Sequence, residues 1–231
     1  MKLSIVISVY QSHEIVRRQV LHFKKMNLSQ DCELIIVDDG SNPPIPEATI
    51  ATGNNLAWTQ GLGRNLGATK AKGEYLFMTD IDHIISKEAI EDALSFTGNK
   101  MIFRRQIAIL DENGDIKQDK ETLKQWGYEK DKLDASVHGN TFVIKRSIFE
   151  ELGGYDPEKS LIGYHPKSRQ GDDCHFNAKW NRKYAGQRPD VGRDIYMFPI
   201  GRFHKYGDLN PKGLFHNLSQ TNQNKHYKHV Q

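Results

Sequence analysis

A chain of 231 residues with 37% hydrophobic and 26% charged residues has the composition of one globular domain, long enough to bury a core without disulfides or a structural metal. Its net charge of +3 is far below what a nucleic-acid-binding protein needs, but it suits an anionic small ligand or a weak peripheral contact with a membrane. The two cysteines, Cys32 and Cys174, form no zinc-binding pattern. With no signal peptide and no window of membrane-spanning length, we expect a cytoplasmic protein whose membrane contacts, where present, are peripheral at the inner face.

The first hundred residues alternate between strand-like and helix-like patterns. The expected strands lie at 3–10, 33–37, 48–51 and 74–79, and the expected helices at 12–25, 63–72 and 86–96. Such alternation predicts an α/β fold with a parallel, doubly wound sheet. In sheets of this kind ligands bind at the carboxyl ends of the strands.

The second half of the chain is less regular. The turn signal at 111–114 predicts a hairpin, and the polar stretch 118–136 is expected on the surface. A strand is expected at 141–145, helices at 147–152 and 172–180, and a loop at 157–170. We therefore predict a single domain over 1–214, followed by a polar C-terminal tail at 215–231.

Two acidic pairs follow two of the expected strands. Asp80 and Asp82 come directly after the apolar run 75–79, and Asp38 and Asp39 follow the strand at 33–37. A buried carboxylate costs several kcal/mol (roughly) unless it is paired, and a divalent cation such as Mg²⁺ or Mn²⁺ is the simplest shared partner. The alternatives are solvated loop aspartates, or a cap for the helix that starts near residue 86.

The glycine-rich stretch 61–67 imitates a dinucleotide-binding fingerprint. That motif requires a strand directly before its glycines, and residues 54–60 do not read as one. The first strand-to-helix turn, at 10–13, contains no glycine. These features argue against a nicotinamide-dependent dehydrogenase.

Several short motifs in this order resemble the family 2 glycosyltransferases with the GT-A fold. They are 4–10 (SIVISVY), 35–41 (IIVDDGS), 63–68 (GRNLGA), 72–76 (KGEYL), 80–82 (DID), 149–156 (FEELGGYD) and 171–173 (GDD). The last two also resemble, more loosely, galactosyl- and N-acetylgalactosaminyl-transferring relatives. The resemblance implies a Rossmann-like, mostly parallel central sheet flanked by helices, with a small antiparallel portion on the acceptor side. It divides the domain into a nucleotide-sugar-binding half at 1–100 and an acceptor-side half at 101–214.

The resemblance also implies roles for residues of the nucleotide-binding half. Asp39 would accept hydrogen bonds from the base, expected to be uracil, while Ser8 and Tyr10 would line the nucleoside pocket and Arg64 would lie beside it. Asp80 would contact the ribose or a metal-bound water. Asp39 or Asp38 could instead cap the turn after the strand, Tyr10 could be ordinary core, and Arg64 could be a surface residue of its helix.

For the metal, Mn²⁺ or Mg²⁺, the resemblance implies Asp82 as the direct ligand, with Asp80 beside it. A C-terminal histidine completes the site in related enzymes, which makes His204 the candidate third ligand and His216 the second choice. His83 is expected in the loop or behind the ligands, and the alternative is that it is itself a ligand.

For the acceptor, the resemblance implies Asp173 as the general base, with Asp172 and Tyr155 binding the acceptor. Asp172 stands where relatives usually carry glutamate. A single base and in-line attack imply inversion at the anomeric carbon. The alternative is that both aspartates complement the positive end of a helix. Trp180, Tyr164 and His138 are either sugar-stacking or core residues.

The chain is therefore expected to be a metal-dependent, inverting glycosyltransferase that moves a sugar from a UDP-sugar to a hydroxyl of a glycan acceptor, in glycan or polysaccharide synthesis. One alternative is a nucleotidyltransferase, which would usually carry a glycine-rich phosphate loop after its first strand. Another is an inactive nucleotide-sugar-binding module, against which the joint presence of Asp39, Asp80, Asp82 and Asp173 argues.

Overall fold

The structure, a computed structural model, describes residues 1–10, 12–53, 60–125, 136–156 and 172–198. Its strands are β1 (Leu3–Val9), β2 (Cys32–Asp38), β3 (Ile50–Ala51), β4 (Tyr75–Thr79), β5 (His83–Ile84), β6 (Lys100–Ile107), β7 (Ile109–Leu110), β8 (Ile116–Lys117), β9 (Ser136–Lys145) and β10 (Asp190–Met197). Its helices are α1 (His13–Met26), α2 (Gln60–Lys70), α3 (Lys87–Ser95), α4 (Lys120–Gln125), α5 (Arg146–Glu151) and α7 (Asp172–Lys183). None of the helices in these ranges is long and apolar enough to cross a membrane.

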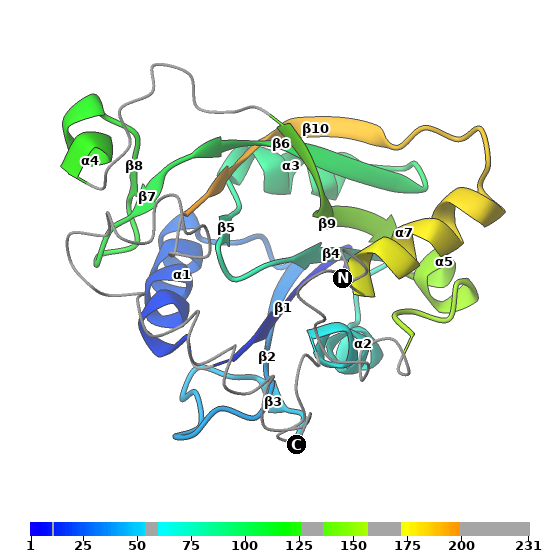
Figure 1. Ribbon diagram of the computed structural model, residues 1–231, viewed down its shortest axis with the longest axis horizontal. Coiled ribbons are helices and arrows are strands. Elements are labelled where there is room, and N and C mark those ends of the chain that lie inside the picture. The colour runs from blue at the N-terminus through cyan, green and yellow to red at the C-terminus, as the bar shows by residue number, and fades with distance from the viewer. Residues whose placement is uncertain (11, 54–59, 126–135, 157–171, 199–231) are drawn as a thin grey trace, which may run out of the picture.

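The main sheet has the order β3-β2-β1-β4-β9-β6-β10-β5, and β7 and β8 form a separate antiparallel pair (Figure 1). Strands β3, β2, β1 and β4 run parallel to one another, whereas β9 is antiparallel to both β4 and β6. The predicted α/β fold, with a mostly parallel sheet and an antiparallel portion in the second half, is confirmed. Because β2 and β4 both run parallel to β1, the residues that follow them emerge at the same edge of the sheet.

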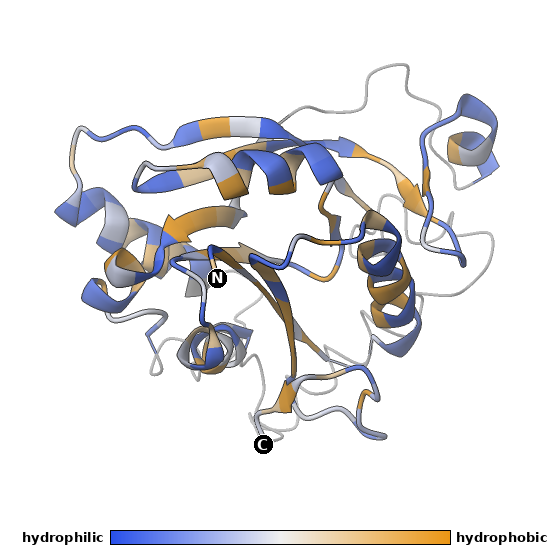
Figure 2. Ribbon diagram, turned by 180° about the vertical axis from the view of Figure 1, so that it is seen from behind, coloured by the Kyte–Doolittle hydropathy of each residue, from blue (hydrophilic) through white to orange (hydrophobic). Residues whose placement is uncertain are grey.

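Strand β1 separates two hydrophobic cores because its side chains point alternately to opposite faces. Ile5 and Ile7 pack in one core with Val16 of α1, while Val6 packs in the other with Ala68 of α2. Figure 1 accordingly shows α1 on one side of β1 and α2 on the other, and in Figure 2 the central strands are largely hydrophobic.

The glycines of the stretch 61–67 let α2 approach the sheet closely. A Cβ on Gly67 would lie 2.4 Å from Cγ1 of Val6, and one on Gly63 would lie 2.2 Å from Oγ of Ser8. Both distances are too short for a real side chain, so the motif that imitates a dinucleotide fingerprint serves helix packing here. Arg64 of the same helix reaches Asp80, directly after β4.

Most expected elements are present with bounds shifted by a few residues, but three features were not predicted. Strand β10 joins the main sheet beside β6, and strand β5 pairs with the end of β10. Helix α4 forms inside the polar stretch 118–136, which was expected on the surface. Leu123 of α4 is buried. The expected loop at 157–170 and the tail at 215–231 lie outside the described residues.

Candidate active site

A tight turn carries the acidic pair from the end of β4 into β5. The backbone N–H of His83 donates to the carbonyl of Asp80 at 3.1 Å, which closes the turn. Asp80, Asp82 and His83 are 1%, 5% and 2% exposed, so the alternative of solvated loop aspartates is wrong. Ser86, rather than either aspartate, caps α3 by accepting from the N–H of Ala89.

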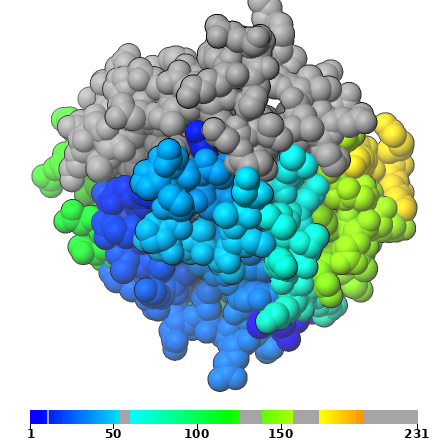
Figure 3. Space-filling view, turned by 90° about the horizontal axis from the view of Figure 1, so that it is seen from below, coloured from blue at the N-terminus to red at the C-terminus, as the bar shows by residue number. Residues whose placement is uncertain are grey.

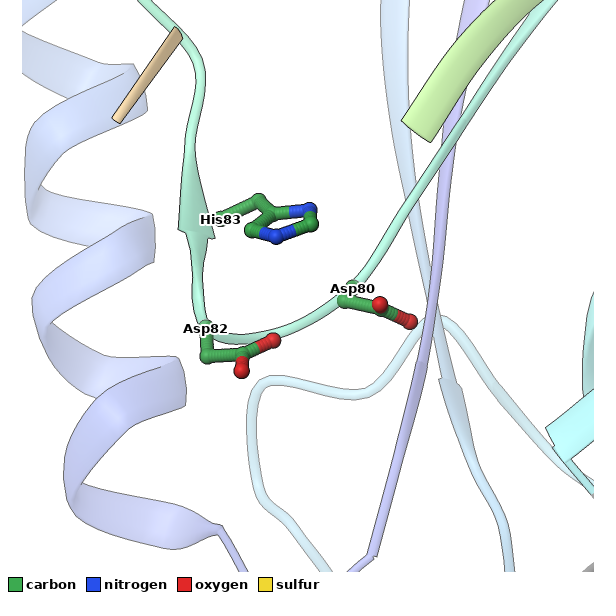
Figure 4. A group of neighbouring side chains, drawn as sticks. All are labelled: Asp80, Asp82 and His83. Atoms are coloured by element: carbon green, nitrogen blue, oxygen red, sulfur yellow. The ribbon is translucent and has the colours of Figure 1, made fainter. Parts of the chain in front are cut away.

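Asp80, Asp82 and His83 lie together along the turn (Figure 4), and each offers one metal-binding atom within 4.8 Å of those of the other two. Nδ1 of His83 lies 2.5 Å from Oγ1 of Thr141, a contact of the kind that orients the imidazole of a metal-binding histidine. Two carboxylates and one imidazole suit Mn²⁺ or Mg²⁺ in charge and ligand type. His83 thus lies among the candidate ligands, which is the alternative that the sequence left open beside a loop or supporting place. His204 and His216 lie outside the described residues.

Arg64 joins this acidic turn to the second half of the chain. Its Nη2 donates to Oδ1 of Asp80 at 2.7 Å, and its Nη1 donates to Oδ1 of Asp173 at 2.9 Å and to the hydroxyl of Tyr155 at 2.7 Å. Gln60 of α2 also donates to Asp80. Arg64 is fully buried, so the alternative of a surface helix residue is wrong.

The charge on Arg64 is secured by its neighbours. Burial alone would lower the pKa of the guanidinium, but Tyr155, Asp80 and Asp173 outweigh that effect and raise the pKa above its ordinary value. Burial raises the pKa of Tyr155, so its hydroxyl stays protonated. The site therefore contains a permanent cation shared by two carboxylates.

Tyr155 belongs to the core beneath the site. Its side chain is fully buried, and its ring stacks on Phe176 with 4.9 Å between centroids. The hydroxyl orients Arg64. A direct contact between Tyr155 and an acceptor stays a prediction.

On the predicted nucleotide side, the two aspartates after β2 have different partners. The carboxylate of Asp38 accepts from the backbone N–H groups of Ser41 and Ile45, at 2.9 and 3.0 Å, and so caps the turn. The carboxylate of Asp39 instead accepts from Oγ1 of Thr52 at 3.2 Å. Turn capping therefore falls to Asp38, which leaves base recognition by Asp39 as the prediction that stands.

The other predicted nucleoside contacts lie at the end of β1. Ser8 is buried, and its Oγ has no hydrogen-bond partner in the part of the chain that the structure describes. Tyr10 is half-buried just beyond the strand, so it is accessible in a way that ordinary core residues are not. Both lie at the carboxyl end of β1. In the parallel pairing of β1 with β2, Val9 lies opposite Asp38, so this end of β1 lies beside the residues that follow β2, beginning with Asp39.

On the predicted acceptor side, α7 begins at Asp172 and carries Asp173 in its first turn. The side chain of Asp173 is 20% exposed, so it meets solvent while it holds Arg64. Trp180 is 2% exposed and is therefore core rather than a sugar-stacking surface. Figure 3 shows the segment around α5 beside α2 on one face of the molecule, in keeping with the hydrogen bond from Asn65 to the carbonyl of Tyr155.

Lys100 is a buried cation that the sequence pattern did not single out. Its ammonium donates to Oδ1 of Asn177 on α7 at 2.8 Å and lies over the rings of Phe142 and Trp180, at 4.8 and 5.1 Å from their centroids. Burial lowers the pKa of Lys100 to about 8. A lysine at the start of a strand usually reaches solvent, so no local signal marks this one.

Comparisons with known proteins agree with this arrangement. A family model described as "Glycosyltransferase like family 2" matches residues 4–166. Because the match covers more than half of the chain, the protein belongs to this family of glycosyltransferases. A comparison with curated proteins gave no match.

Solved structures of S. aureus TarS share the fold. TarS 1–349 in complex with UDP has a TM-score of 0.57 and 17% identity, covering 90% of this chain and 64% of that chain. TarS 1–349 in complex with UDP-GlcNAc has a TM-score of 0.57 and 14% identity, covering 86% and 58%. The chain thus spans less than two thirds of the length of these structures.

Proposed function

We propose that the protein is a metal-dependent, inverting glycosyltransferase that moves a sugar from a UDP-sugar to a hydroxyl of a glycan acceptor. The observation that carries the proposal is the buried group of Asp80, Asp82 and His83 at the carboxyl edge of the sheet, joined through Arg64 to Asp173. Family membership favours this reading over the nucleotidyltransferase alternative. Synthesis of a glycan or polysaccharide is the expected setting.

On the donor side, Asp82, Asp80 and His83 would hold Mn²⁺ or Mg²⁺. A bound divalent cation would offset the negative charge that develops on the leaving diphosphate. Asp39, Ser8 and Tyr10 would receive the nucleoside at the neighbouring strand ends. The UDP and UDP-GlcNAc complexes of structures with the same fold support a uridine donor.

On the acceptor side, Asp173 is proposed as the general base. The acceptor hydroxyl transfers its proton to the Asp173 carboxylate as its oxygen bonds to the anomeric carbon, while the bond from that carbon to the diphosphate oxygen breaks. Attack opposite the leaving group inverts the anomeric centre. Arg64 keeps Asp173 oriented. The side chain of Asp173 is 20% exposed, which gives an acceptor access to its carboxylate.

A thermal-shift panel of nucleotides and nucleotide sugars, in Mn²⁺ and in EDTA, tests the proposal. Ligands that bind the folded state alone raise the unfolding temperature. We expect UDP and one or more UDP-sugars to raise it in Mn²⁺ and not in EDTA. Stabilisation by nucleoside triphosphates alone would point to nucleotidyl transfer, and no response to any uridine nucleotide would contradict the proposal.

A further inference from the structure

Gln19 of α1 is a fully buried amide that the proposed reaction does not use. Its Nε2 donates to the carbonyl of Ile81 at 3.1 Å and to the carbonyl of His83 at 3.0 Å. These two carbonyls flank Asp82. One side chain from a distant helix thus holds the backbone on both sides of the candidate metal ligand, and in Figure 4 a helix runs beside the turn that carries Asp82.

The other carbonyls of the same turn are also held. The carbonyl of Asp80 accepts from the N–H of His83 at 3.1 Å, and the carbonyl of Asp82 accepts from the N–H of Phe198 at 2.7 Å. The backbone from 80 to 83 is therefore tied to itself, to α1 and to the chain just after β10. A metal site needs this kind of support, because its ligands must keep their relative positions to within about 0.5 Å.

The amide of Gln19 lowers the stability of the core at this position. Within the described residues, its Oε1 is buried and has no hydrogen-bond partner. An unsatisfied buried acceptor lowers stability, whereas an apolar side chain of the same length would avoid that cost. The two donated hydrogen bonds are what the amide adds over an apolar residue.

We propose that Gln19 is a positioning residue of the metal site: by holding the carbonyls of Ile81 and His83, it fixes the turn that brings Asp80, Asp82 and His83 together. The inference rests on the proposed metal dependence and extends it to a helix that contributes no ligand. Support from outside the ligand set commonly changes metal affinity by about 10- to 100-fold.

His22 of α1 provides a matched control three residues along the same helix. It is also buried, and its ring nitrogens lie 2.9 Å from the carbonyl of Ile85 and 3.1 Å from that of Gly114. These contacts hold backbone beyond the turn. A purely structural role for such contacts predicts similar effects of Gln19→Met and His22→Met, whereas positioning predicts different effects on metal binding.

The experiment titrates Mn²⁺ into each protein in the presence of UDP and measures free Mn²⁺ by electron paramagnetic resonance, with thermal unfolding in EDTA as the measure of fold. We expect Gln19→Met to weaken Mn²⁺ binding by about tenfold or more, and His22→Met to leave it within about twofold for a comparable loss of stability. Gln19→Asn, which keeps the amide on a shorter arm, is the second variant and is expected to weaken binding as well. If Gln19→Met does not fold, Mn²⁺ binding by Gln19→Asn is compared with that of the wild type instead.

Wild-type affinity in the Gln19 variants, or equal weakening in His22→Met, would overturn the positioning role and leave the proposed function standing. Failure of the wild-type protein to bind Mn²⁺, with or without UDP, would overturn both.

Discussion

Asp80 and Asp173, which lie far apart in the sequence, accept hydrogen bonds from one buried guanidinium, that of Arg64, at 2.7 and 2.9 Å. Asp80 follows β4 and is one of the candidate metal ligands, and Asp173 lies in the first turn of α7 on the proposed acceptor side. Because the same planar cation holds both, the two carboxylates keep a fixed separation. The proposed donor and acceptor halves are thus joined by Arg64.

Replacement of Arg64 by Met is expected to destabilise the protein strongly. The change leaves the carboxylates of Asp80 and Asp173 without their shared cation, and loss of one partner from a buried ionic network typically costs about 3–5 kcal/mol. Urea denaturation measures the loss. Arg17→Met is the control, because the Arg17 side chain is 44% exposed in its pair with Glu14 and should change the free energy of unfolding by about 1 kcal/mol or less. Equal losses in the two variants would contradict the bridging role.

Asp173→Asn is expected to retain nucleotide binding and lose transfer. The amide cannot take the proton from the acceptor, and loss of a general base typically lowers the rate by about 10²–10⁴. Initial rates of sugar transfer, beside calorimetric titration of UDP, separate the two effects. Asp190→Asn, at an exposed acid on β10, is the control. A variant that transfers sugar at the wild-type rate would remove Asp173 as the base.

Lys100→Met is expected to stabilise the protein at pH 7. The pKa of Lys100 falls from 10.5 to about 8 on burial, so between these values the unfolded state binds more protons and wild-type stability rises with pH. Below about pH 8 the ammonium is charged in both states, and the full penalty for burying it is present. The variant also loses the contacts of Lys100 with Asn177 and the aromatic rings. The expected net increase in the free energy of unfolding at pH 7 is therefore about 1–3 kcal/mol.

Urea denaturation at pH 7 and pH 9.5 tests this expectation. The advantage of Lys100→Met should shrink at the higher pH, because the wild-type lysine is then largely neutral in the folded state. Lys87→Met, at an exposed position on α3, should show no such pH dependence. An advantage that is absent, or that grows with pH, would contradict burial of a charged Lys100.

Gly63→Ala is expected to destabilise the protein by about 1–3 kcal/mol, because an added Cβ would lie 2.2 Å from Oγ of Ser8 and would push α2 away from β1. The double variant Ser8→Ala, Gly63→Ala should recover part of the loss, since it removes the hydroxyl from the clash. Chemical denaturation of the single and double variants gives the coupling energy. Additive effects would show that the two residues do not meet.

The sequence alone was sufficient to predict the parallel half of the sheet and the acidic edge. Apolar runs identify β1, β2 and β4, and parallel neighbours bring the residues after them to one edge, so Asp39 and Asp80 could be placed together without a structure. Strand β10 could not be found in this way, because its segment contains Asp190, Gly192 and two further charged residues and reads as loop.

The buried polar residues of the site were harder to predict. Hydrogen-bond partners that lie 16 or more positions away in the sequence hold Arg64, Lys100 and Gln19. The local spacing of residue types gives no indication of such contacts. His83 was adjacent to the acidic pair in the sequence, but its place among the ligands depends on the tight turn closed by the Asp80 carbonyl. Periodicity reports which face of an element is buried, not which polar groups meet there.

Calorimetric titration of UDP in Mn²⁺ into the wild-type protein and into Asp82→Ala tests whether the acidic turn is a metal-dependent uridine-nucleotide site. We expect the wild type to bind UDP and the variant to show no detectable binding, with circular dichroism showing the fold intact. Unchanged UDP affinity in Asp82→Ala would contradict the metal assignment.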